Sequence, residues 1–201
     1  MQMIETTPEA IFHLKTQDEQ MKAAVDRIGP ISREMNEDIF VALMESILSQ
    51  QISGKAARTV WARLLSITGI VTPDRILECE DALLQSAGLS FRKVSYMKRT
   101  AQAIKDEIID INRFPMMSDA DIISELVKLP GIGVWTAEML LIFSLGRQDV
   151  VSFNDFGIRK GMMKLYELSD LSKEQFMVYR KRYAPFGTAA SLFLWEIAGG
   201  R

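Results

Sequence analysis

Leu129-Pro130-Gly131-Ile132-Gly133-Val134-Trp135-Thr136-Ala137 is the most informative stretch of this sequence. It separates two segments with helical periodicity. Its two glycines permit a tight turn whose backbone N–H groups point outward at the start of the second helix. Free N–H donors at the positive end of a helix suit an anionic group such as a phosphate. The glycines alone favour an ordinary turn between helices, so the surrounding residues must discriminate between a turn and a phosphate site.

An aspartate follows the turn, separated from it by one helix and a short connector. Asp155 lies at the expected start of the next helix, directly after Phe153 and Asn154. An aspartate at a helix start is usually a cap. Here Asn154 can do the capping, so we expect the side chain of Asp155 to point into a cleft.

Helix signals dominate the rest of the chain. Expected N-caps and glycine stops alternate along it, at Thr7, Gly29, Ser53, Gly69, Thr72, Ser90, Ser118, Gly146, Ser172 and Gly199. We expect a buried helix over 37–51, a long helix from Ser90 through about Ile111 and a helix over 134–145. The run 149–153 is the only strand-like segment. About ten helices without a hairpin signal predict an all-α fold.

Composition excludes several classes of protein. The chain has 201 residues, of which 48% are hydrophobic and 25% charged, as in a folded globular protein. With one cysteine, Cys79, and one histidine, His13, it cannot form an internal disulfide, a thiolate-held cluster or a zinc site of nitrogen and sulfur ligands. No apolar run approaches the ~20 residues that span a bilayer. We therefore expect a cytoplasmic protein without a membrane segment.

Charge is sorted along the chain although the net charge is only −2. Three segments, 50–63, 85–105 and 156–164, carry lysines and arginines without an acidic residue. Such segments could neutralise phosphates while the rest of the surface stays acidic. They are also compatible with ordinary solvated helix faces, and both interpretations remain open.

The helix–LPGIG–helix pattern with Asp155 resembles the helix-hairpin-helix (HhH-GPD) DNA glycosylase superfamily, over about residues 36–198. ILSQQISGKAA at 47–57 is similar to the family segment that fills the hole left by an extruded base. GLSFRKVSYMKRTA at 88–101 is similar to the alkylpurine branch, that of 3-methyladenine DNA glycosylase II. The resemblance implies one glycosylase unit over 1–201 with two lobes and no separate β domain. One helical lobe, around 46–160, would hold the hairpin 129–133, and the N- and C-terminal helices would form the second.

Two positions narrow the expected chemistry. Trp135 stands where bifunctional family members place a lysine that attacks the sugar. Tryptophan cannot form an imine, so no lyase activity through this residue is expected. The single cysteine excludes the iron–sulfur cluster of members that resemble endonuclease III. One departure is Gly187, which stands where the branch usually has arginine, within APFGTAASLFLW at 184–195.

The resemblance implies a monofunctional glycosylase that flips alkylated purines, of the 3-methyladenine and 7-methylguanine type, out of double-stranded damaged DNA. Asp155 would stabilise the positive charge that develops on the sugar, and Trp135 and Phe153 would line the base pocket. Leu129, Gly131, Ile132 and Gly133 would form the DNA-binding hairpin, and Gln51 with Gln50 the wedge. Expected phosphate contacts are Lys55, Arg58, Arg92, Lys93, Arg159 and Lys160. The resemblance implies no metal cofactor, allows a monovalent ion at the hairpin when DNA is bound, and implies a monomer associated with the nucleoid in a prokaryote.

Other interpretations remain open at this stage. The enzyme could act on oxidised, deaminated or mismatched bases, or the chain could be a non-catalytic helix-hairpin-helix DNA-binding protein. An α-helical interaction scaffold does not account for the hairpin, Trp135 and Asp155 together. Trp135 could instead pack in the core beside Leu141, and we expect Trp195 to be a core residue. The two glutamines could simply end a helix.

Overall fold

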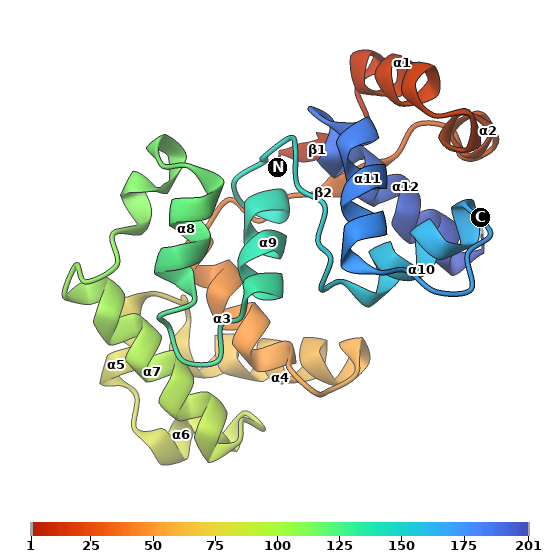
Figure 1. Ribbon diagram of the computed structural model, residues 1–201. Coiled ribbons are helices and arrows are strands. Elements are labelled where there is room, and N and C mark those ends of the chain that lie inside the picture. Colours follow the sequence, from red (N-terminus) through yellow and green to blue (C-terminus); the bar gives the residue numbers. More distant parts are fainter. Residues whose placement is uncertain (1, 201) are drawn as a thin grey trace. The chain divides into compact units, whose positions relative to one another are not determined.

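The computed structural model describes residues 2–200, which form two compact units. One unit combines the residues up to Met35 with those from Leu141 onward, and the other is Asn36–Leu140 (Figure 1). The division falls inside helix α9 (Val134–Phe143), not at the predicted bounds of 46 and 160. Residues 141–160 belong with the termini because the helix that starts at residue 156 packs against the C-terminal helix.

The unit Asn36–Leu140 is entirely helical. Its elements are α3 (Ile39–Ser49), α4 (Gly54–Thr68), α5 (Pro73–Glu78), α6 (Asp81–Ser86), α7 (Phe91–Lys105), the 3-10 helix η1 (Ile111–Met116), α8 (Asp119–Leu126) and the first turns of α9. The caps predicted at Ser53, Thr72, Ser90 and Ser118 are confirmed, since each side chain accepts an N–H three residues later. α3 is apolar on most sides and packs against α4 and α7, which accounts for its burial.

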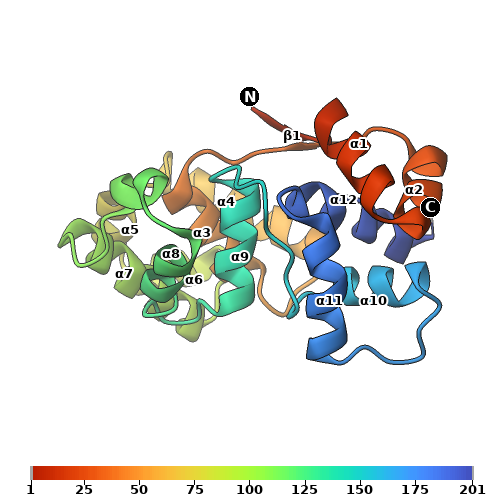
Figure 2. The same ribbon diagram turned by 45° about the horizontal axis from the view of Figure 1, so that its top comes forward.

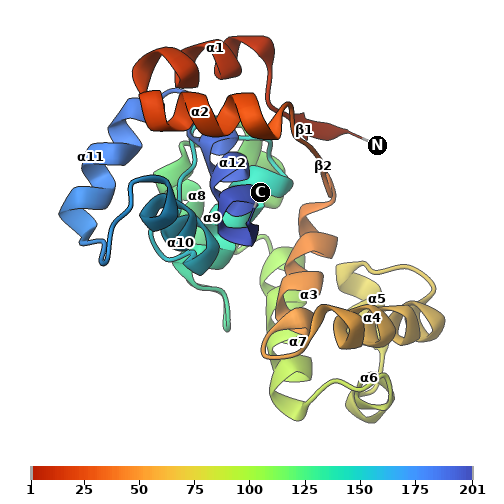
Figure 3. The same ribbon diagram turned by 90° about the vertical axis from the view of Figure 1, so that its right-hand side faces the viewer.

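The other unit is built around its C-terminal helix. It contains β1 (Met3–Glu5), α1 (Pro8–Gln17), α2 (Glu19–Ile28), β2 (Ser32–Glu34), the end of α9, α10 (Phe156–Leu165), α11 (Lys173–Tyr183) and α12 (Gly187–Gly199). α12 contacts α1, α2, α10 and α11 (Figures 2 and 3). Its approach to α10 requires a glycine, because a Cβ on Gly161 would lie 2.0 Å from the Leu194 carbonyl oxygen.

A buried polar cluster joins three helices of this unit. Asp18 caps α2 by accepting the Met21 N–H, and its other oxygen accepts bonds from Tyr166 and Arg182 at 2.7 and 2.9 Å. The hydroxyls of Tyr166 and Tyr183 are 2.7 Å apart. Burial raises the pKa of both phenols far above the usual range, so both are protonated donors at neutral pH.

Two expected elements differ from the structure, although the all-α class is confirmed for the residues described. The run 149–153 is not a strand, because side chains of α12 bond to its backbone. Thr188 accepts the Val150 N–H, and Ser191 donates to the Val150 carbonyl. The helix expected to reach Ile111 ends at Lys105. Glu107 soon after it has φ +55°, a left-handed conformation that interrupts a helix. The only described strands are β1 and β2, which pair antiparallel.

Candidate DNA-binding hairpin and active site

The predicted hairpin joins α8 to α9. Leu129 and Ile132 anchor it, with side chains only 3% and 5% exposed, and the Ile132 N–H donates to the Leu129 carbonyl at 3.2 Å. Gly131 has φ +81°, and a Cβ there would lie 2.4 Å from the Tyr96 ring. Gly133 has neither constraint, since nothing lies within 4 Å of the position of its Cβ. The turn therefore needs a glycine at 131, whereas Gly133 leaves the surface open in front of α9.

The two glutamines after α3 have different roles. The Gln50 side chain donates from Nε2 to the Gly131 carbonyl oxygen at 2.8 Å, so in this structure it supports the hairpin. Gln51 is exposed and has φ +59°. Of the pair, Gln51 alone projects from the surface as a wedge must.

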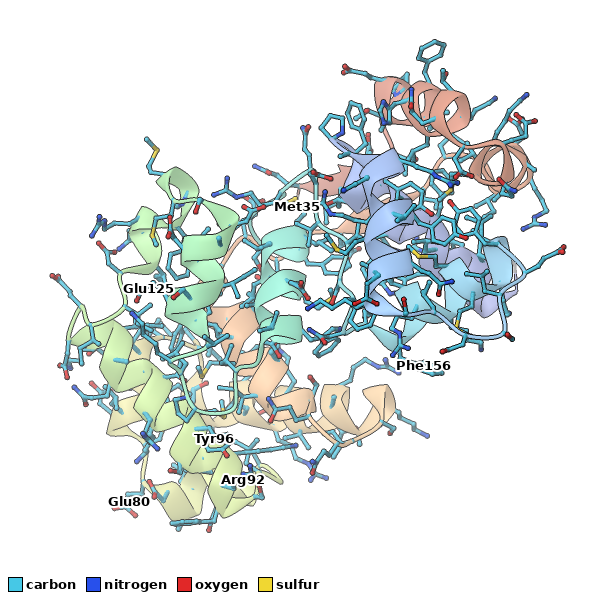
Figure 4. All side chains as sticks on the ribbon, in the orientation of Figure 1. Met35, Glu80, Arg92, Tyr96, Glu125 and Phe156 are labelled. Carbon is cyan, nitrogen blue, oxygen red and sulfur yellow. The ribbon has the colours of Figure 1, made fainter. Side chains whose placement is uncertain are left out.

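The predicted phosphate contacts of this unit fall into two groups. Lys55 and Arg58 are exposed at the start of α4, whose first turn has no acidic residue. Arg92 instead donates to the Tyr96 hydroxyl at 2.6 Å, and Figure 4 shows the two side chains together near the hairpin. Lys93 donates from Nζ to the Leu48 carbonyl at 2.7 Å, and burial lowers the pKa of its ammonium. The Lys93 ammonium therefore satisfies one of the last carbonyl groups of α3.

Asp155 has a role in the fold as well as a predicted role in chemistry. It is 7% exposed and caps α10, because its Oδ1 accepts the Ile158 N–H at 2.7 Å. The expectation that Asn154 caps this helix is wrong: the extended backbone of Asp155, with φ −82° and ψ 119°, makes it the N-cap. The same oxygen also accepts the indole N–H of Trp195 at 2.9 Å.

Trp195 is the functional candidate that the sequence interpretation missed. It packs partly buried against the core of this unit, in line with the expectation, but its indole N–H also orients Asp155 across 40 positions of sequence. Gly157 makes room for it, since a Cβ there would lie 2.7 Å from the indole and 3.1 Å from the Asp155 carboxylate. Phe143 stacks on the indole at 5.7 Å between ring centroids. A small residue two positions after Asp155 is the one local signal of this packing.

The remaining predicted residues are distributed over the two units. Phe153 is half-buried, packs edge-to-face on Phe176 and lies 4.9 Å from the Arg159 guanidinium. The Nε of Arg159 is buried without a hydrogen-bond partner, so this side chain differs from a solvated phosphate contact. Lys160 is exposed. Trp135 belongs to the unit Asn36–Leu140 and is 46% exposed, which excludes the alternative that it packs in the core.

The neighbours of residue 187 explain why a glycine stands at this position. The Gly187 N–H donates to Asp149 Oδ1 at 3.1 Å, and a Cβ at this position would lie 2.6 Å from that oxygen. Arg180 donates to the other oxygen of Asp149 at 3.2 Å and to its carbonyl at 3.0 Å. A guanidinium therefore neutralises Asp149 from α11, and residue 187 has no room for a side chain.

A glycine-containing turn between two helices, with exposed cations near the start of α4 in the same unit, is the arrangement of a helix-hairpin-helix protein. Residues 44–185 match the HhH-GPD superfamily base excision DNA repair protein family, and the chain belongs to this family. The family expected from the sequence is thereby confirmed.

Similar proteins are named as glycosylases. DNA-3-methyladenine glycosylase 1 of Schizosaccharomyces pombe is 31% identical over 97% of this chain and 89% of its own length. The crystal structure of a DNA-3-methyladenine glycosidase from Bacillus halodurans is 30% identical, with a TM-score of 0.90 over 100% of this chain and 94% of that one. The S. pombe 3-methyladenine DNA glycosylase in complex with abasic DNA is 33% identical, with a TM-score of 0.82 over 94% of this chain and 95% of that one.

Two further observations concern residues 2–200. No three side chains of His, Cys, Asp or Glu gather there in a group that could hold a metal ion. Among the same residues, every helix is too short or too polar to cross a bilayer.

Proposed function

We propose that this protein is a monofunctional DNA glycosylase that excises alkylated purines from double-stranded DNA by hydrolysis of the N-glycosidic bond. The observation that carries the proposal is the Asp155 carboxylate, buried and held by two N–H donors. A helix cap needs only the Ile158 N–H, whereas the second donor, the Trp195 indole, orients the carboxylate as base excision requires.

The chemistry follows from where charge develops. As the bond to the base breaks, the deoxyribose becomes positively charged, and a preorganised carboxylate stabilises that charge. The Ile158 N–H and the Trp195 indole fix the direction of the Asp155 carboxylate before the reaction. Asp155 would also orient the attacking water.

The residue inventory favours cationic bases over neutral ones. The single histidine, His13, bonds to the Arg182 carbonyl and packs against Phe186, so it is engaged within α1 and its neighbours. Alkylated purines such as 3-methyladenine and 7-methylguanine carry a positive charge and leave without prior protonation. The exposed indole of Trp135 suits such a base through cation–π attraction of ~0.5–2 kcal/mol. The names of the relatives support the same substrate class.

Trp135 also supports the absence of lyase activity, because it occupies the position of the Schiff-base lysine and has no amine. At the hairpin, the Leu129 carbonyl oxygen accepts the Ile132 N–H and the Gly131 carbonyl oxygen accepts the Gln50 amide, and a carbonyl oxygen has two lone pairs. These oxygens therefore fit a monovalent cation that joins the hairpin to a DNA phosphate, and we include such an ion in the proposal for the DNA-bound state.

Incubation with methylated DNA tests the proposal. Chromatography of the supernatant should detect free 3-methyladenine and 7-methylguanine, and the remaining strand should stay uncut at its abasic sites. Borohydride should trap no covalent complex with the DNA. Release of oxidised or deaminated bases in place of methylated ones would assign the enzyme to a different substrate class. If no base is released, the protein would be a non-catalytic DNA-binding protein.

A further inference from the structure

The loop after α3 is held in a conformation that glutamine seldom adopts. Gln51 has φ +59°, a region that costs a residue with a Cβ on the order of 1 kcal/mol. Such strain persists only where the surroundings enforce it. On one side the Ile52 N–H donates to the Ser49 carbonyl at 3.4 Å, and on the other Ser53 caps α4.

The end of α3 that leads into this loop is also fixed. Lys93 on α7 donates from Nζ to the Leu48 carbonyl, one of the last carbonyls of α3. This contact is partly buried, so it holds the end of the helix against α7. The loop can therefore neither fray with α3 nor move freely with α4.

Gln50 connects this fixed loop to the hairpin. Its Nε2 donates to the Gly131 carbonyl oxygen at 2.8 Å, across 81 positions of sequence. The hairpin end of this bond is equally rigid, because the Tyr96 ring packs against Gly131, and Leu129 and Ile132 are buried. One amide thus joins two well-fixed backbone segments within the same compact unit.

We propose that Gln50 is a positioning residue that makes the wedge loop and the hairpin a single rigid reader of duplex DNA. The proposal rests on the proposed function, in which the hairpin binds a backbone phosphate and Gln51 fills the vacated stack. When the hairpin binds its phosphate, Gln51 is already aimed at the base stack. Displacement of the damaged nucleotide is then coupled to the contact between the hairpin and the DNA phosphate. The loop that carries Gln51 needs no separate movement toward the DNA.

The substitution Gln50→Met tests this role, because it keeps the length of the side chain and removes the amide donor. Gln102→Met is the matched control: the Gln102 amide also makes one hydrogen bond, but to Asp106 one turn along α7. We expect Gln50→Met to melt within a few degrees of the control. Single-turnover excision of 7-methylguanine should slow by roughly 3- to 10-fold, the scale of one hydrogen bond, while the control keeps the wild-type rate.

A fluorescent neighbour reports the coupling directly. 2-Aminopurine placed beside the 7-methylguanine brightens when stacking is lost, and Gln50→Met should reduce the amplitude or rate of that rise. In a Gln51→Ala background, Gln50→Met should have little further effect, because its influence passes through Gln51.

The outcomes separate this proposal from the function on which it rests. An excision rate for Gln50→Met equal to that of Gln102→Met overturns the coupling. The coupling is also overturned if the losses in excision rate caused by Gln50→Met and Gln51→Ala are additive in the double variant. If Gln50→Met excises at the wild-type rate while Gln51→Ala is slow, the coupling is rejected and the wedge role of Gln51 is retained. A Gln51→Ala variant that flips and excises normally removes the wedge itself, and with it the coupling.

Discussion

At the scale of single residues, Asp155 is both a helix cap and the proposed catalytic group. The substitution Asp155→Asn keeps an oxygen that can accept the Ile158 and Trp195 N–H groups, but it removes the negative charge. We expect DNA binding to persist and single-turnover excision to fall by at least ~100-fold. Asp38→Asn, at the N-cap of α3, is the matched control and should keep the wild-type rate. Near-normal excision by Asp155→Asn would remove Asp155 from the mechanism.

Trp195 has an effect that can be isolated with one substitution. Trp195→Phe keeps an aromatic ring against Phe143 and removes the indole N–H that bonds to Asp155. Since a hydrogen bond to a charged group contributes about 1.5–3 kcal/mol, we expect excision to slow by roughly 10-fold or more with DNA affinity unchanged. Single-turnover rates at saturating enzyme measure this. An unchanged rate would assign Trp195 a packing role alone.

Substitutions of the two hairpin glycines should affect different properties, stability at position 131 and DNA affinity at position 133. Gly131→Val puts a β-branched side chain at a backbone with φ +81° and against the Tyr96 ring, so we expect a loss of about 2–4 kcal/mol in the free energy of unfolding. At Gly133 an added Cβ would meet no atom within 4 Å, so Gly133→Val should cost about 1 kcal/mol or less, yet it should weaken binding to damaged and undamaged duplex alike. Urea denaturation and duplex titration separate the two effects. Equal affinity of folded Gly133→Val for DNA would argue against the phosphate-binding role.

At the scale of elements, local signals could be predicted and long-range ones could not. Ser53, Ser90 and Ser172 were identified as caps because capping involves only residues within one turn. The run 149–153 was misassigned because its hydrogen bonds go to α12, about 40 positions later in sequence. The partners of Gln50 and Lys93 were missed for the same reason.

The cluster around Asp18 is the element-scale contact with the largest expected effect on stability. Asp18→Ala removes a cap of α2 and leaves Tyr166 and Arg182 without their carboxylate, inside a region where Asp18 is 4% exposed. We expect a loss of about 3–5 kcal/mol in the free energy of unfolding, measured in urea. Asp26→Ala is the control, since its surface ion pair with Lys15 should contribute under ~1 kcal/mol. Similar losses in the two variants would contradict the structural role of the cluster.

At the scale of the whole molecule, charge sorted along the sequence is only partly sorted in space. The basic segment 85–105 contains no acidic residue, but Lys98 pairs with Asp81 and Lys105 with Asp74, both from preceding helices. Sequence could therefore indicate where cations are dense, and it could not indicate which of them an acid already neutralises. It predicted the family and the all-α class because those depend on the hairpin motif and on local helix signals.

Salt dependence measures how many cations remain for DNA. Among the predicted phosphate contacts, Lys55, Arg58 and Lys160 are exposed, whereas Arg92 and Lys93 make hydrogen bonds within the protein, so we expect only some of these charges to displace counterions. Each phosphate contact contributes about −0.9 to the slope of log affinity against log salt, and we expect a total slope of roughly −2 to −4. Lys55→Ala should flatten the slope by about 0.9 and weaken binding to all sequences equally. Lys98→Ala, whose ammonium is paired with Asp81, should leave the slope unchanged. Titrations of undamaged duplex at several salt concentrations measure both variants, and a wild-type slope near zero would mean that these cations are solvated helix faces with no part in binding DNA.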